Sequence, residues 1–339
     1  MEDSITHYII EYVWIGGNNE LRSKIKIIHS SSGLKKIPDW NFDGSSTNQA
    51  KGNDSEVIIK PRATFYGASN NKNCVHIYVL CDTYVKNLPH PTNNRNVANA
   101  IFNADLKQEP WFGLEQEYFI IKKDGKPLGY EYSTEQGQYY CSVGYENAYG
   151  RKIAEEHMNL CIEVGIKISG INSEVAPGQW EFQVGPCIGI QAGDHLWMAR
   201  YLLCKIAEKH KCSINFEPKP LKGDWNGSGC HTNYSTKLMR EGSGDNNGLY
   251  YIDQAIVKLS YIHDEHMAVY GNNNEQRMTG AHETASFNKF TSGIADRGAS
   301  IRIGNENYNN KCGYFEDRRP SSNCDPYLVT SKLFHNNFL

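Results

Sequence analysis

The chain has 339 residues, of which 39% are hydrophobic and 22% charged, a composition typical of a globular protein with one large or two ordinary domains. Its 35 basic and 38 acidic side chains give a formal net charge of −3 without any basic run, so we expect no nucleic acid and no membrane as partners. No segment approaches the ~20 apolar residues of a membrane span, and the acidic N-terminus is unlike a secretory signal. The ten scattered cysteines lack a C-x-x-C pair, so we predict reduced thiols in a cytoplasmic protein.

Short strands separated by turns are predicted for residues 11 to 85. The segment KIKIIHS alternates polar and apolar residues, EVIIKP ends at a proline, and NCVHIYVLCD is an apolar run typical of a buried strand. The proline-bearing stretch NLPHPTNNRN follows and is the best candidate for a domain boundary. We therefore predict two domains, residues 1–88 and 89–339.

Helices are predicted beyond residue 90. The first lies in ENAYGRKIAEEHMNLCIEVG and stops at Gly165, and the second begins after Asp194 as its N-cap. A third covers LYYIDQAIVKLSYIHDEHMAVYG, with apolar residues at helical spacing. Short strands, including WFGLEQEYFI and QWEFQVGP, lie between them, so the fold class is α+β, a small β-rich domain followed by a larger mixed one.

Two strand segments carry glutamates among apolar residues. Glu115 and Glu117 are two positions apart in WFGLEQEYFI, so their carboxylates share one face of the strand. Glu181 lies between Trp180 and Phe182, and Glu174 precedes it across a Pro-Gly turn. Like charges in apolar surroundings need a proton or a cation, and oxygen-rich clusters suit Mg²⁺ or Mn²⁺. Four unrelated surface glutamates are the alternative.

A glycine-rich segment and an arginine-rich one follow. WNGSGCHTNYST carries glycines that let backbone amides approach a ligand, and His231 in it is a ligand, a base or a structural residue. The last third holds arginines that could bind carboxylates or phosphates through two hydrogen bonds, or could make solvated salt bridges. Together with the acidic cluster they indicate a divalent-metal enzyme that acts on a phosphate-bearing substrate.

Seven motifs carry a resemblance to one family. They occur in order across nearly the whole chain: NFDGSST, WFGLEQEY, GINSEVAPGQWEFQVGP, NGSGCHTN, RMTGAHET, RGASIRI and YFEDRRPSSNCDPY. The sequence resembles a eukaryotic-type (class II) glutamine synthetase. The resemblance implies an N-terminal β-grasp domain and a catalytic domain with a curved antiparallel sheet flanked by helices. It also implies homo-oligomeric rings, expected to be two stacked pentamers, with active sites between subunits.

The implied reaction joins ammonia to the γ-carboxylate of L-glutamate. ATP phosphorylates glutamate to γ-glutamyl phosphate, and ammonia displaces phosphate to give glutamine, with Mg²⁺ or Mn²⁺ as the cofactor. The resemblance implies that one metal ion is held by three glutamates and the second by two glutamates and a histidine. The first set is Glu117, Glu174 and Glu181, and the second is Glu115, His231 and Glu316.

Substrate-binding and catalytic residues are implied in the same way. Glutamate would be bound by Arg277, Arg318 and the backbone around Gly227. Arg297 and Arg302 would meet the ATP phosphates, and Arg297 would also contact the phosphoryl group in flight. Asp43 of an adjacent subunit would bind ammonium and take its proton, although an Asp-Gly turn alone would explain this residue. Glu283 would be the carboxylate of a closing flap.

The chain departs from the family pattern in three places. Its segment before the first strand is short, which bears on subunit contacts. Asp296 stands where the family has Asn, and Gly304 and Asn305 replace a Pro-Arg pair, which would remove one phosphate contact. Three other readings stay open: a family member that keeps the fold without turnover, a ligase for another amine, and a generic metal-dependent phosphatase or kinase.

Overall fold

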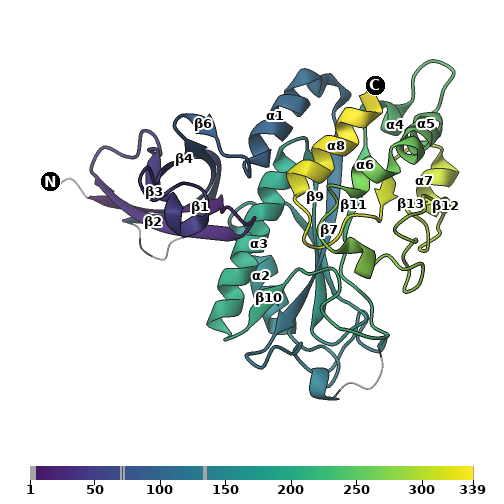
Figure 1. The fold of residues 1–339 in the computed structure, drawn as a ribbon, viewed down its shortest axis with the longest axis horizontal. Coiled ribbons are helices and arrows are strands. Elements are labelled where there is room, and N and C mark those ends of the chain that lie inside the picture. The colour runs from purple at the N-terminus through teal and green to yellow at the C-terminus, as the bar shows by residue number, and fades with distance from the viewer. Residues whose placement is uncertain (1–4, 69–70, 72, 133–135, 339) are drawn as a thin grey trace.

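The computed structural model describes residues 5–68, 71, 73–132 and 136–338, and places two β-sheets side by side with helix α3 (Gln191–Lys209) between them (Figure 1). The order of elements confirms the α+β class. None of the described helices is long and apolar enough to cross a membrane.

The first sheet contains the six strands of the N-terminal part. In the order of pairing these are β2 (Leu21–Ser30), β1 (Thr6–Ile15), β5 (Cys74–Val85), β4 (Glu56–Gly67) and β3 (Trp40–Asp43), with β6 (Leu88–Pro89) also on β5. Strands β1 and β5 run parallel and the other pairs antiparallel. The prediction that EVIIKP ends at its proline is wrong. Strand β4 continues through Pro61 because the register shifts between Pro61 and Ala63, which accommodates the missing amide donor.

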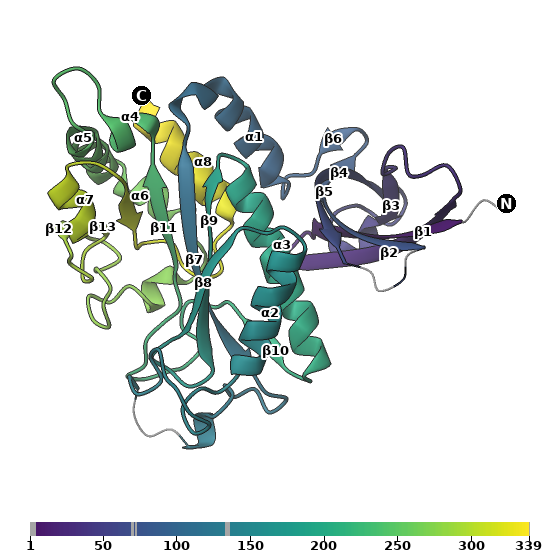
Figure 2. The ribbon, with the colours of Figure 1, turned by 180° about the vertical axis from the view of Figure 1, so that it is seen from behind.

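The second sheet spreads its eight strands over the rest of the chain. Their order is β12 (Ser292–Ile294), β13 (Ile301–Ile303), β14 (Phe315–Asp317), β11 (Cys230–Ser235), β7 (Trp111–Ile121), β9 (Gln179–Ile188) and β8 (Ile168–Ser173), with β10 (Ser213–Asn215) also on β7. Among the described strands of this sheet, β12 and β13 pair in parallel and the other pairs are antiparallel. The long central strand β7 pairs with β9, β10 and β11, which all come later in the chain, and Figure 2 shows this part of the sheet from behind.

Helices cover this sheet, and two of the predicted helix boundaries are wrong. The α-helices besides α3 are α1 (Asn94–Ala104), α2 (Arg151–Glu163), α4 (Lys237–Glu241), α5 (Gly248–Tyr261), α6 (His263–Met267), α7 (Asn305–Asn310) and α8 (Pro326–Phe338). The third predicted helix is interrupted at Ile262, which separates α5 from α6. Asp194 is not an N-cap, because α3 begins at Gln191. Its buried carboxylate instead accepts hydrogen bonds from Arg95 and Tyr327.

A buried charge joins the first sheet to helix α3. Glu11 on β1 is 1% exposed, and it accepts hydrogen bonds from Lys205 Nζ at 2.6 Å and from the Tyr201 hydroxyl, both on α3. Burial tends to raise the pKa of Glu11, but hydrogen bonds from His76, Lys205 and Tyr201 outweigh it and lower the pKa to about 2. The N-terminal sheet is thus attached to α3 by an ionised carboxylate with several donors.

Candidate active site

The eight-stranded sheet forms one wall of a cavity of about 380 Å³. Strands β7, β8, β9, β11, β13 and β14 contribute to its lining, together with loops that include those after β8, β12 and η4 (Asn274–Gln276) and the loop before β11. Twelve of the thirteen residues predicted for the site line this cavity. They are Glu115, Glu117, Glu174, Glu181, Gly227, His231, Arg277, Glu283, Arg297, Arg302, Glu316 and Arg318.

The register of the strands explains why the glutamates meet. Glu117 on β7 is directly opposite Glu181 on β9, and Glu115 is directly opposite His231 on β11. Directly paired residues put their side chains on the same face of a sheet, with β-carbons about 4.5–5.5 Å apart. Because Glu115 and Glu117 also share a face, β7 presents one carboxylate toward each neighbouring strand.

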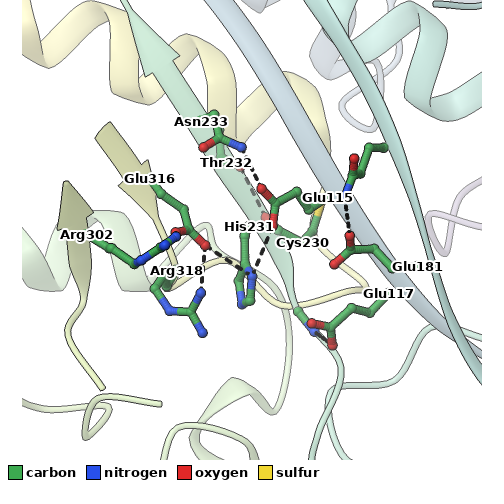
Figure 3. Close-up of polar contacts among 12 residues, drawn as sticks. Glu115, Glu117, Glu181, Cys230, His231, Thr232, Asn233, Arg302, Glu316 and Arg318 are labelled. Atoms are coloured by element: carbon green, nitrogen blue, oxygen red, sulfur yellow. Dashed lines mark hydrogen bonds and ion pairs between the residues drawn. The ribbon is translucent and has the colours of Figure 1, made fainter. Parts of the chain in front are cut away.

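Two clusters of three potential metal ligands result. The first cluster consists of Glu117, Glu174 and Glu181, and the second of Glu115, His231 and Glu316. In each cluster the ligand atoms lie within 4.8 Å of one another. His231 Nδ1 is 3.6 Å from Glu115 Oε2 and 3.5 Å from Glu316 Oε1, and Figure 3 shows the ring between these two carboxylates. The six residues group as the resemblance implied, and they come from four strands and one loop.

Burial perturbs these groups in the direction expected for a metal site. Desolvation, followed by repulsion from neighbouring carboxylates, raises the pKa of Glu174 and Glu181, and desolvation raises that of Glu117. For His231, desolvation and the nearby charge of Arg318 lower the pKa well below its usual value. The imidazole is therefore neutral and can donate a nitrogen lone pair, and a cation would compensate the carboxylates.

Arginines approach the second cluster from one side. Glu316 Oε2 is 2.7 Å from Arg302 Nη1, and its Oε1 is 2.6 Å from Arg318 Nη1 (Figure 3). Arg302 on β13 thus has an anionic partner, as a partly buried guanidinium needs. Arg277 is 4% exposed, and its Nε and Nη2 donate to Asn274 Oδ1 and to the carbonyls of residues 318–320. These bonds fix the guanidinium at the cavity wall.

Gly227 lies where no side chain fits. A β-carbon at this position would stand 2.3 Å from the Pro218 carbonyl oxygen and 2.5 Å from Arg277 Cγ. The backbone of residue 227 is therefore packed directly against the arginine predicted to bind substrate, as expected where main chain approaches a ligand closely.

Four carboxamides that the sequence analysis missed orient the metal-site carboxylates. Each donates to one glutamate: Asn172 to Glu174 at 2.8 Å, Gln183 to Glu181 at 2.7 Å, Asn233 to Glu115 at 2.8 Å, and Gln179 to Glu117 at 3.5 Å. Such donors hold one carboxylate oxygen and leave the other for a cation. The i, i+2 spacing of Glu181 with Gln183 on β9 was the available signal, because it puts both side chains on the same strand face.

Asp43 is the predicted site residue that lies outside the cavity. It ends β3 and caps the 3₁₀ turn η1 (Gly44–Thr47), where its carboxylate accepts bonds from the Ser45 amide and from the hydroxyls of Ser45 and Ser46. These hydroxyl bonds lower its pKa to about 2. None of the described residues 5–88 lines the cavity of its own chain.

The fold and the site define a class of enzyme that uses divalent cations to act on a phosphorylated, anionic substrate. The family model described as "Glutamine synthetase, catalytic domain" matches residues 92–336. A chain from Acanthamoeba polyphaga mimivirus is 56% identical over 329 residues, covering 95% of this chain and 92% of that one. The cytosolic glutamine synthetase isozyme of Pinus sylvestris (50% identical) and the nodule isozyme of Vigna aconitifolia (51%) each cover 98% of this chain and 94% of their own.

This chain therefore belongs to the glutamine synthetase family. It is an enzyme that forms glutamine from glutamate and ammonia with ATP and a divalent metal ion, as the motifs predicted. A solved structure titled "Apo GmaS without ligand" is similar in fold, with a TM-score of 0.74 and 19% identity, and the match covers 99% of this chain and 78% of that one.

Proposed function

We propose that the two ligand clusters hold two divalent cations and that the rest of the cavity assigns each substrate its place. The observation that carries this proposal is the grouping of six ligands into two sets of three within a single arginine-lined cavity. Glu117, Glu174 and Glu181 would hold one cation, and Glu115, His231 and Glu316 the other. Bound cations supply charge neutralisation along the phosphates of ATP and on the transferred phosphoryl group.

Arg277, Arg318 and the backbone at Gly227 bind glutamate in this proposal. Both guanidinium groups are buried, at 4% and 6% exposure, and carry fixed positive charge at the cavity wall. Arg277 uses Nε and Nη2 for internal hydrogen bonds, which leaves Nη1, beside Gly229, to donate to a substrate carboxylate.

Arg297 and Arg302 contact the phosphates of ATP, and Arg297 also contacts the phosphoryl group during transfer. Both line the cavity, and the contact between Arg302 and Glu316 places the guanidinium beside the second metal cluster. Asp296 is not among the residues that line the cavity, and its carboxylate accepts a hydrogen bond from the Gly298 amide at 2.8 Å. We therefore expect the unusual acid at position 296 to leave turnover intact.

The chemistry follows from these positions. A carboxylate is a poor electrophile, and transfer of the γ-phosphoryl group makes the γ-carbonyl of glutamate susceptible to attack. Ammonia then adds to this carbonyl, phosphate leaves, and the nitrogen loses a proton to Glu283, which lines the cavity. The acyl phosphate also hydrolyses in water, so turnover requires the loop that carries Glu283 to exclude solvent.

The ammonium site requires a second subunit in this proposal. Asp43 lies outside the cavity of its own chain, and its low pKa keeps it ionised, as binding of a cation requires. An adjacent copy would bring Asp43 to the open side of the site, which supports a homo-oligomeric ring, expected to be a decamer of two pentamers, with active sites between subunits. We further propose a domain boundary at residues 88–89 and a cytoplasmic location. The β6 strand and the name of the cytosolic Pinus sylvestris isozyme support these two points.

The experiment is release of phosphate by the purified protein with ATP and Mg²⁺, with glutamate and ammonium omitted in turn. Release that needs both substrates and is lost in Glu283→Ala, but not in the exposed control Glu275→Ala, is expected. Release with glutamate alone that ammonium does not enhance would favour another amine. No release from a folded oligomer would contradict the proposed roles and favour a relative without turnover.

A further inference from the structure

The loop that carries Glu283 has a strained backbone. Thr279 and Ser286 pair across its base, and between them His282 and Glu283 have φ angles of +52° and +59°. Two consecutive non-glycine residues rarely adopt this left-handed conformation, and such a turn persists only where surrounding contacts hold it. The loop formed by residues 279–286, called the flap loop below, must therefore be held by contacts with its neighbours.

Two side chains from outside the flap loop contact the His282 ring, and a third, Arg318, donates from Nη2 to the Glu283 carbonyl oxygen at 3.2 Å. Gln136 Nε2 donates to His282 Nδ1 at 3.2 Å, and Gln136 Oε1 accepts the backbone amide of Asn226 at 2.7 Å. On the other side of the ring, His282 Nε2 donates to Asp224 Oδ1 at 2.9 Å. A neutral imidazole with its proton on Nε2 satisfies both bonds at once.

The two contacts differ in strength. The Asp224 side chain is 95% exposed, so water competes for its carboxylate and the hydrogen bond from His282 contributes little. Gln136 is half-buried and uses both ends of its amide, one on the flap loop and one on Asn226, which precedes Gly227. Gln136 therefore connects the flap loop to the backbone that is proposed to bind glutamate.

We propose that Gln136 and His282 are positioning residues that hold the flap loop closed over the acyl phosphate. This inference rests on the proposed function. Without the contact, water enters and attacks the γ-carbonyl carbon, the bond from this carbon to the phosphoryl oxygen breaks, and glutamate, phosphate and a proton are released. ATP is then consumed without formation of glutamine.

The test measures phosphate released per glutamine formed, at saturating ATP and glutamate and limiting ammonium. The native enzyme should give a ratio near one. Gln136→Ala and His282→Ala should each raise the ratio about two- to fivefold, the effect expected for one lost hydrogen bond. The double variant should do no worse than the stronger single one, because both substitutions remove the same contact.

Three further variants separate this contact from other causes. His282→Asn keeps an acceptor near the position of Nδ1 and tolerates the left-handed conformation, so its ratio should stay near that of the native enzyme. Asp224→Asn should have little effect, and Lys222→Ala, an exposed residue of the same segment, should have none. Melting temperatures within a few degrees of the native value would show that the variants are folded.

Unchanged ratios in both Gln136→Ala and His282→Ala would overturn the inference, as would a rise in His282→Ala alone. Failure of the proposed function would give a different result from failure of this inference. In that case the native protein itself would release no phosphate in response to glutamate and ammonium, before any variant is made.

Discussion

Asp317 offers a test of how a buried ion pair on the far side of β14 stabilises the site. It lies on β14 between Glu316 and Arg318, so its side chain points away from the cavity into the interior, where it and Arg319 are both 0% exposed. Asp317 accepts bonds from Arg319 Nε at 2.9 Å, Arg319 Nη2 at 2.7 Å and the Tyr270 hydroxyl at 2.7 Å. Burial tends to raise the pKa of Asp317, but the Arg319 charge and these bonds hold it below the usual value.

Replacement of Asp317 by alanine would leave the Arg319 guanidinium buried without a counter-charge. Removing one partner of a buried ion pair costs about 3–5 kcal/mol, a large part of the about 5–15 kcal/mol that keeps a domain folded. Because β14 also carries Glu316, we expect weaker binding of metal as well as lower stability.

The measurement is equilibrium unfolding in urea at one fixed protomer concentration, since subunit association contributes to apparent stability. Asp245→Asn, an exposed residue of a loop, is the control and should change the free energy of unfolding by less than about 0.5 kcal/mol. A cost below about 1 kcal/mol for Asp317→Ala would refute the reasoning, because the pair would then not compensate a desolvated charge.

Three more results are expected. The raised pKa values of Glu117, Glu174 and Glu181 mean that the folded metal-free protein binds more protons than the unfolded chain. Its melting temperature should therefore fall as pH rises above about 4.5. For the same reason, Mn²⁺ should stabilise the protein more at about pH 8 than at about pH 6. The opposite trend in differential scanning fluorimetry would contradict this. Asn233→Ala should weaken Mn²⁺ binding about 10- to 100-fold in calorimetry because the donor to Glu115 is lost, and unchanged affinity would count against its role. Gly227→Ala should cost about 1–3 kcal/mol through its clash with the Pro218 carbonyl and raise the KM for glutamate more than that for ATP, whereas equal KM changes would contradict the placement of glutamate.

The sequence by itself determined the fold class and which residues were predicted as metal ligands. Alternation along WFGLEQEYFI is a local property of a strand, so it predicted that Glu115 and Glu117 share a face without knowledge of any neighbour. Sequence motifs likewise named the partners in each cluster, and the structure places those partners together.

The tertiary structure decided what depends on pairing between distant segments. The opposition of Glu117 to Glu181 and of Glu115 to His231 is set by strand register, which no local pattern encodes. The same limit explains why the role of Asp194 was mistaken, because its partners Arg95 and Tyr327 are about 100 residues or more away in sequence. The donor roles of Asn233 and Gln136 arise in the same way, since each depends on a neighbour that only the folded chain brings within hydrogen-bonding distance.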